Sequence, residues 1–172
     1  MQLIEAIKLI QHKDIPQAEP QTWADLGCGS GLFTQALASL LNNNSTIYAV
    51  DKSIGAFKRF ATTVSIELIQ KNFIKANLNL SDLDGVIMAN SLHFVKDKFP
   101  FIDKISAIIS KGGQLLIVEY DTDTPNPWVP YPVSFSALKQ LFKEEKYGSI
   151  TKLHQQPSAF GRANIYSTVV KL

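Results

Sequence analysis

The sequence lacks the residues and segments that mark several classes of protein. It contains one cysteine, Cys28, so neither an intrachain disulfide framework nor a cysteine-rich metal site can form. No apolar run approaches the ~20 residues that a membrane-spanning helix needs. The N-terminal segment is too short, and too interrupted by charge, for a signal peptide. We therefore expect a cytoplasmic protein with no membrane partner and no bound metal.

Clusters of charge of one sign are also absent. The 172 residues include 17 Lys and Arg and 15 Asp and Glu, giving a formal net charge of +2. The basic residues are scattered, whereas a nucleic-acid surface normally gathers them on one face. The apolar fraction of 45% and the charged fraction of 19% are close to the average of soluble globular domains. A nucleic-acid partner is therefore not expected.

The chain has the length and pattern of one domain. Leu3, Ile7 and Ile10 recur at helical spacing and predict an N-terminal helix within residues 1–13. Pro16 and Pro20 indicate a linker over residues 14–21. The core of the domain should then occupy residues 22–172.

Short apolar runs alternate with amphipathic segments along this core. The runs predict strands at 22–26, 46–50, 66–70, 85–89, 114–120, 149–154 and 165–170. Helices are predicted at 32–41, 53–61, 99–109 and 135–142, with Ser134 as an N-cap and Gly112-Gly113 as a C-terminal cap. The alternation favours a parallel sheet with helices on both faces, and the last two strands, joined by a short loop, must pair antiparallel. The expected fold is α/β, a doubly wound Rossmann-like seven-stranded sheet, mostly parallel, with the last strand antiparallel.

The turn after the first strand is rich in glycine. Residues 25–31 read DLGCGSG, and the first strand–helix turn of a doubly wound sheet is a natural ligand site. The dinucleotide fingerprint is G-x-G-x-x-G, but Leu32 stands where that pattern requires its third glycine. Asp25 suits a cationic group, contacted directly or through water, better than a pyrophosphate. A nicotinamide site is therefore disfavoured.

The segment DLGCGSG resembles motif I of class I S-adenosylmethionine-dependent methyltransferases, and the resemblance continues in order along almost the whole chain. Residues 66–73 (IELIQKNF), 84–95 (DGVIMANSLHFV) and 111–117 (KGGQLLI) are similar to the later motifs of the small-molecule, type 11/12-like subgroup. The resemblance implies that Asp51 binds both ribose hydroxyls. Asn72, where the family usually has Asp, would bind the adenine amino group. The cofactor-binding set that it implies is Asp25, Gly27, Cys28, Gly29, Gly31, Asp51, Lys52, Asn72, Phe73 and Asn90.

Two residues near the expected methyl group allow alternative interpretations. Cys28 is either a reactive thiol or a small side chain packed under the cofactor, and the second interpretation is favoured because no partner histidine or second cysteine is evident. His93 is either a general base, since its unperturbed pKa lies near neutrality, or a residue that shapes the pocket or caps a helix.

Residues 119–132 form the most unusual segment, with four prolines, two tyrosines and a tryptophan. A loop of this length is usually functional, and here it follows a strand on the ligand side of the sheet. It is either part of the substrate pocket or its lid, or a packed connection. Arg162, in the loop between the last strands, either pairs with an acidic substrate group or forms a surface ion pair. The candidate substrate residues are His93, Tyr120, Trp128, Tyr131 and Arg162, of which His93 and Tyr131 are the candidate catalytic residues.

The predicted function is methyl transfer from S-adenosylmethionine to a small-molecule acceptor by in-line displacement. The protein has mainly to align the reacting atoms and exclude water, and it needs a base only for a nucleophile that carries a proton. The alternatives are a methyltransferase acting on protein or RNA, and a non-catalytic cofactor-binding partner subunit. We expect a monomer or homodimer. Its pocket is closed by the N-terminal helix and the proline-rich segment of residues 119–132 (the proline loop), or is completed by a second subunit.

Overall fold

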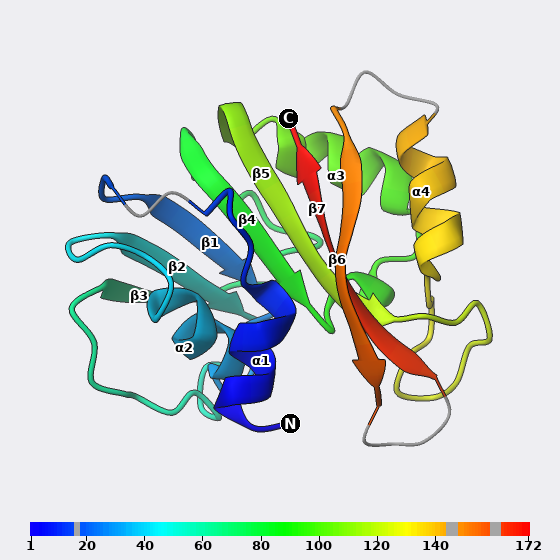
Figure 1. Cartoon of the computed structure of the whole chain (residues 1–172), viewed down its shortest axis with the longest axis horizontal. Helices are drawn as coiled ribbons and strands as arrows, with labels where there is room; N and C mark the ends of the chain where they lie inside the picture. Colours follow the sequence, from blue (N-terminus) through cyan, green and yellow to red (C-terminus); the bar gives the residue numbers. More distant parts are fainter. Residues whose placement is uncertain (16–17, 144–147, 159–162) are drawn as a thin grey trace.

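The computed structural model describes residues 1–172 except 16–17, 144–147 and 159–162. Its centre is a seven-stranded sheet in the order β3-β2-β1-β4-β5-β7-β6 (Figure 1). Strands β1 to β5 are parallel, and β7 is antiparallel to both β5 and β6. This arrangement confirms the predicted fold. The strands are β1 (Thr22–Leu26), β2 (Thr46–Asp51), β3 (Ser65–Gln70), β4 (Leu83–Ala89), β5 (Ile109–Tyr120), β6 (Ile150–Pro157) and β7 (Asn164–Lys171).

Helices cover both faces of the sheet. α1 (Leu3–Ile10) and α2 (Leu32–Ala38) pack against one face, in a buried apolar cluster that includes Trp23 and Leu116. α3 (Lys98–Ser106) and α4 (Phe135–Lys143) pack against the other face, in a cluster with Ile117 and Tyr166. Leu116 and Ile117 are neighbours in β5, so alternate strand residues supply the two layers, as expected for a sheet buried on both sides.

The predicted helix over residues 53–61 is wrong. Residues 52–64 have no regular secondary structure and fold back on the glycine-rich turn of residues 25–31 (the glycine loop). The Lys58 amide donates there to the Ser30 carbonyl at 3.0 Å. A Cβ added at Gly31 would lie 2.7 Å from the Phe57 ring, so the absence of a side chain at Gly31 makes room for Phe57. A helix this short is marginal by itself, so tertiary contacts decide the conformation of the segment.

The predicted helix cap at Gly112-Gly113 is also wrong. α3 ends at Ser106, and both glycines lie inside β5, which already begins at Ile109. Gly112 has φ 84°, and the pairing of β4 with β5 shifts register between Leu83 and Gly85. A left-handed residue serves a helix C-cap and a strand irregularity equally well, which explains the error. The other predicted cap is confirmed, because the Ala137 amide donates to the Ser134 hydroxyl at 3.1 Å.

Candidate active site

The glycine loop turns the chain from β1 into α2 at the carboxyl edge of the sheet. Gly27, Gly29 and Gly31 have φ values of 86°, 51° and 88°, in the left-handed region that favours glycine. A Cβ at Gly27 would lie 2.5 Å from the Ser91 side chain, whereas a Cβ at Gly29 would meet nothing within 4 Å. The loop therefore packs against Ser91 at Gly27 and is open at Gly29, so its backbone can approach a ligand closely at Gly29.

Asp51 ends β2 beside this loop. One carboxylate oxygen accepts the Gly29 amide and the other accepts the Ser53 amide, each at 3.0 Å. Each carboxylate oxygen can accept two hydrogen bonds, so both retain capacity for a ligand hydroxyl. The predicted pairing of Asp51 with two ribose hydroxyls therefore fits the geometry. The neighbouring side chain of Lys52 is exposed.

Two buried oxygens at the ends of β1 and β4 have no hydrogen-bond partner. Asp25 is 1% exposed and accepts the Thr34 hydroxyl at 2.6 Å on one oxygen, but its other oxygen is unpaired. Burial raises the pKa of Asp25 to about 7; the Thr34 bond opposes this shift and Asp51 adds to it. Asn90, with φ 53°, also has an unpaired buried Oδ1. Unpaired buried acceptors are costly, so the site is suited to a ligand that brings hydrogen-bond donors, such as an ammonium group.

Two further predicted cofactor-binding residues, Asn72 and Phe73, differ in their surroundings. The ring of Phe73 is buried, 3.3 Å from a Cβ built on Gly27, and packs edge-on against Phe101. Asn72 is exposed, and its Oδ1 accepts the amides of Ile74 and Lys75 at 3.0 and 3.3 Å. This oxygen therefore caps a local turn.

Cys28 is buried inside the loop. Its pKa is raised to about 12, first by burial and then by the neighbouring carboxylates of Asp25 and Asp51. A thiol with so high a pKa remains protonated and is a poor nucleophile. The interpretation of Cys28 as a packed side chain fits these surroundings.

His93 forms a buried pair with Glu119, a residue whose role was not predicted from the sequence. The His93 Nδ1 lies 2.8 Å from one Glu119 oxygen, and the His93 amide donates to the other at 3.1 Å. Both side chains are almost fully buried, at 4% and 1% exposure. In the tautomer whose Nδ1–H donates to Glu119, Nε2 is the nitrogen that can accept a proton. A sequence signal for this role did exist, because Glu119 is the one acid in the buried strand that ends at Tyr120.

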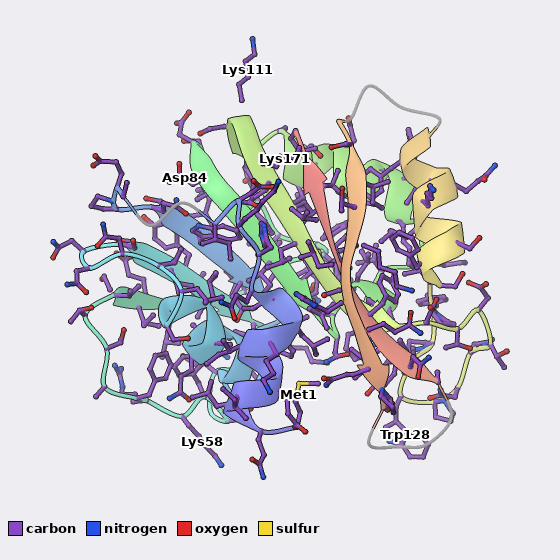
Figure 2. The ribbon with its side chains drawn as sticks, viewed as in Figure 1. Met1, Lys58, Asp84, Lys111, Trp128 and Lys171 are labelled. Atoms are coloured by element: carbon purple, nitrogen blue, oxygen red, sulfur yellow. The ribbon has the colours of Figure 1, made fainter. Side chains whose placement is uncertain are left out.

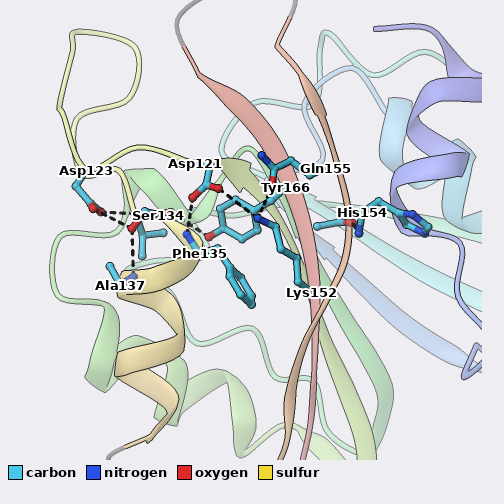
Figure 3. Close-up of polar contacts among 11 residues, drawn as sticks. Asp121, Asp123, Ser134, Phe135, Ala137, Lys152, His154, Gln155 and Tyr166 are labelled. Carbon is cyan, nitrogen blue, oxygen red and sulfur yellow. Dashed lines mark hydrogen bonds and ion pairs between the residues drawn. The ribbon is translucent and has the colours of Figure 1, made fainter.

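The proline loop is anchored at both ends to the start of α4. Figure 3 shows Asp121 accepting the Phe135 amide at 2.9 Å and Asp123 accepting the Ser134 amide at 2.9 Å and its hydroxyl at 2.8 Å. Lys152, on β6, pairs with Asp121 at 3.3 Å. Carboxylates at a helix N-terminus are favourable, so α4 and the loop stabilise each other.

The candidate residues within this loop lie apart from one another. The Tyr131 amide donates to the His93 carbonyl at 3.0 Å, while the Tyr131 side chain is exposed. Trp128 is 79% exposed on a turn closed by Asn126, and Figure 2 places it at the lower right of the molecule. Arg162 lies outside the described residues.

A pocket of about 380 Å³ lies at the carboxyl ends of β4 and β5. It includes the predicted residues Asn90 and Tyr120, and the Tyr120 ring centroid lies 6.3 Å from that of His93. His93, Trp128 and Tyr131 do not line it. The N-terminal helix closes one side, as predicted, whereas no side chain from residues 121–134 contributes. The lining residues are Met1, Glu5, Leu32, Phe33, Asn90, Tyr120, Gln156, Pro157, Ser158 and Ile165.

The part of the chain that the structure describes contains neither a metal-binding cluster nor a membrane-spanning helix. No group of three or more His, Cys, Asp or Glu side chains could hold a metal ion there. In the same part of the chain, no helix has the length and hydropathy needed to span a membrane.

Comparison with known families identifies the fold and its cofactor. The model of the family described as "Methyltransferase domain" matches residues 24–117, which include the glycine loop, Asp51 and the end of β4. The chain belongs to this family. It is a class I S-adenosylmethionine-dependent methyltransferase, and its cofactor is S-adenosylmethionine.

Curated relatives of this methyltransferase include polyketide synthases of Dictyostelium discoideum. Probable polyketide synthase 13 is 36% identical over 131 residues, which cover 76% of this chain and 4% of that protein. Probable polyketide synthase 29 is 27% identical over 137 residues, which cover 68% of this chain and 4% of that protein. The chain thus spans a small part of the length of these relatives.

Solved methyltransferase structures share the fold. The 1,6-didemethyltoxoflavin-N1-methyltransferase of Burkholderia thailandensis, with 1,6-didemethyltoxoflavin and S-adenosylhomocysteine bound, has a TM-score of 0.69 at 15% identity, over 98% of this chain and 77% of that chain. The CMeT domain of the citrinin polyketide synthase has a TM-score of 0.64 at 14% identity, over 92% of this chain and 48% of that chain. At these identities the similarity establishes the fold alone.

Proposed function

We propose that this methyltransferase acts on an acidic carbon that lies between two carbonyl groups of a small acyl thioester. The observation that carries the proposal is the buried His93–Glu119 pair. Its support from relatives is the match to polyketide synthases, whose names imply chains of acyl units. A neutral amine attacks a methyl group without help, whereas a carbon acid must first lose a proton, so a prepared base favours a carbon acceptor.

Three residues of the chain carry out the removal of the proton and the binding of the acceptor. His93 Nε2 takes the proton from the acceptor carbon, and Glu119 stabilises the resulting imidazolium through Nδ1–H. The carbon then forms its bond to the methyl group, and the electron pair of the broken carbon–sulfur bond remains on sulfur. S-adenosylmethionine supplies an electrophilic methyl group on a sulfonium centre. Tyr120, between the pocket and His93, is placed to contact the acceptor.

For the cofactor, we assign the ribose hydroxyls to Asp51 and the amino group to Asp25 and Asn90. The unpaired oxygens of Asp25 and Asn90 are the acceptors that an ammonium group requires. The amides of the glycine loop would lie against the end of the cofactor that carries the amino group. The ring of Phe73 packs against the loop at Gly27.

Cofactor affinity should rise with pH through neutrality. In the free protein the pKa of Asp25 is about 7, so the group is mostly protonated at lower pH, and binding a cation there requires release of that proton. We expect calorimetric affinity for S-adenosylhomocysteine to increase several-fold between about pH 6 and about pH 8, with proton release detected as a buffer-dependent enthalpy. The neutral variant Asp25→Asn should bind more weakly and show no such rise. Equal affinity of the wild-type protein across this range would contradict the assignment.

The proposed acceptor can be tested with the acetoacetyl thioester of N-acetylcysteamine. We expect the protein to transfer a methyl group to the carbon between the two carbonyls, identified by mass spectrometry and NMR. In heavy water without the methyl donor, the protein should also accelerate hydrogen exchange at that carbon, because proton removal comes first. Methylation of amines in a metabolite panel, with no reaction of the thioester, would replace the carbon acceptor by one that needs no base.

A further inference from the structure

Lys98 is the first residue of α3, and its ammonium group contacts backbone carbonyls rather than other side chains. Its Nζ donates to the Val95 carbonyl at 2.9 Å and to the Tyr131 carbonyl at 2.6 Å. These carbonyls belong to two separate segments, the connection after β4 and the proline loop. A single half-buried cation therefore joins the two segments through charge-assisted hydrogen bonds, which are stronger than neutral ones.

The same two segments are joined again at His93. The Tyr131 amide donates to the His93 carbonyl at 3.0 Å, while the Val95 amide donates to the Leu92 carbonyl and closes the 3-10 helix η1 (Leu92–Phe94). A closed ring of contacts thus runs from His93 through η1 to Lys98, then to Tyr131 and back to His93. The His93 backbone is thus bonded to Tyr131 through its carbonyl and to Glu119 through its amide.

The charge of Lys98 also acts on the His93–Glu119 pair. Burial lowers the pKa of Lys98, and the Glu119 carboxylate opposes that shift, so the ammonium and the carboxylate are within electrostatic reach. The other titratable groups around the pair are Tyr120, whose ring neighbours His93, and Tyr166 of β7, which senses the charge of Glu119. Tyr120 and Tyr166 are neutral near neutral pH, so Lys98 is the cation that balances Glu119 in this group.

We propose that Lys98 is a positioning residue, which clamps η1 to the proline loop and so holds His93 in register with Glu119. The inference rests on the proposed function of His93 as the base. It gives the proline loop a role in the reaction although no side chain of residues 121–132 lines the pocket. Any acceptor that contacts the exposed loop residue Trp128 would then be coupled to the geometry of the base.

The variant Lys98→Met tests this role, because it keeps the aliphatic stem and removes the charge. With the acetoacetyl thioester we expect kcat to fall by about 10- to 100-fold, as for a small misplacement of a catalytic group. The KM for the donor and the affinity for S-adenosylhomocysteine should be unchanged. Lys98→Arg should restore most of the activity, and Lys96→Met, at an exposed neighbouring lysine, should behave as wild type.

A second measurement needs no substrate. In Lys98→Met the Tyr131 amide, which donates to the His93 carbonyl, should lose protection from hydrogen exchange, while amides in β1 and β2 keep theirs. Full protection of the Tyr131 amide, or a kcat equal to that of the wild-type protein, would overturn the positioning role. A loss of cofactor affinity in proportion to kcat would also overturn it, since that indicates general destabilisation. If His93→Gln remains fully active, the proposed base is wrong, and the Tyr131 exchange still decides whether Lys98 forms the clamp.

Discussion

Replacing His93 with glutamine should lower kcat for the acetoacetyl thioester by about 10²- to 10⁴-fold, the usual contribution of a general base. Glutamine keeps a polar side chain of similar length but cannot accept a proton near neutral pH. Affinity for S-adenosylhomocysteine should remain unchanged, since His93 does not line the pocket that contains Asn90. Steady-state kinetics and calorimetry would measure the two quantities separately.

Glu119→Gln should have the same kind of effect, because the amide can still accept the Nδ1–H but no longer stabilises an imidazolium. His154→Gln serves as the control, since His154 contacts the Gln11 carbonyl through its ring and glutamine can make a similar contact. An unchanged kcat in His93→Gln, together with unchanged hydrogen exchange at the acceptor carbon, would eliminate the base and favour an amine acceptor.

Replacing Asp51 with alanine should lower affinity for S-adenosylhomocysteine by about 10²- to 10⁴-fold. Two hydrogen bonds from ribose hydroxyls to a carboxylate would be lost, each of about 1.5–3 kcal/mol. The Gly29 and Ser53 amides would also lose their acceptor, so the glycine loop would lose a contact that holds it open to the ligand. Titration calorimetry of the purified variant measures the change directly.

Two further variants make the Asp51 result specific. Asp51→Asn retains one acceptor oxygen and should fall between wild type and alanine. Glu67→Ala removes an exposed carboxylate from the adjacent edge strand and should bind S-adenosylhomocysteine as the wild-type protein does. Affinity of Asp51→Ala within a few-fold of wild type would refute the ribose assignment.

The strands were predictable because the evidence for each lies within a few consecutive residues. The apolar run before Gly27 and the run before Asn90 are buried on both faces of the sheet, so they need no partner to be recognised. The helix at 53–61 failed for the opposite reason. Its apolar residues contact the glycine loop, some 25 residues earlier, and no local pattern reports that contact.

The sequence by itself determined the class of this protein, its sheet and its cofactor. Glycines with left-handed backbone, an acid at the end of β2 and alternating apolar strands are local features, and local sterics and burial specify what each can form. Only the tertiary structure decided which acid supports His93, because Glu119 is 26 residues away and meets it through the parallel pairing of β4 with β5. The clamp from Lys98 to Tyr131 spans 33 residues and depends on the path of the proline loop. Side chains brought together by register and loop path leave no periodic signal, since their pairing is set by packing between elements rather than along one of them.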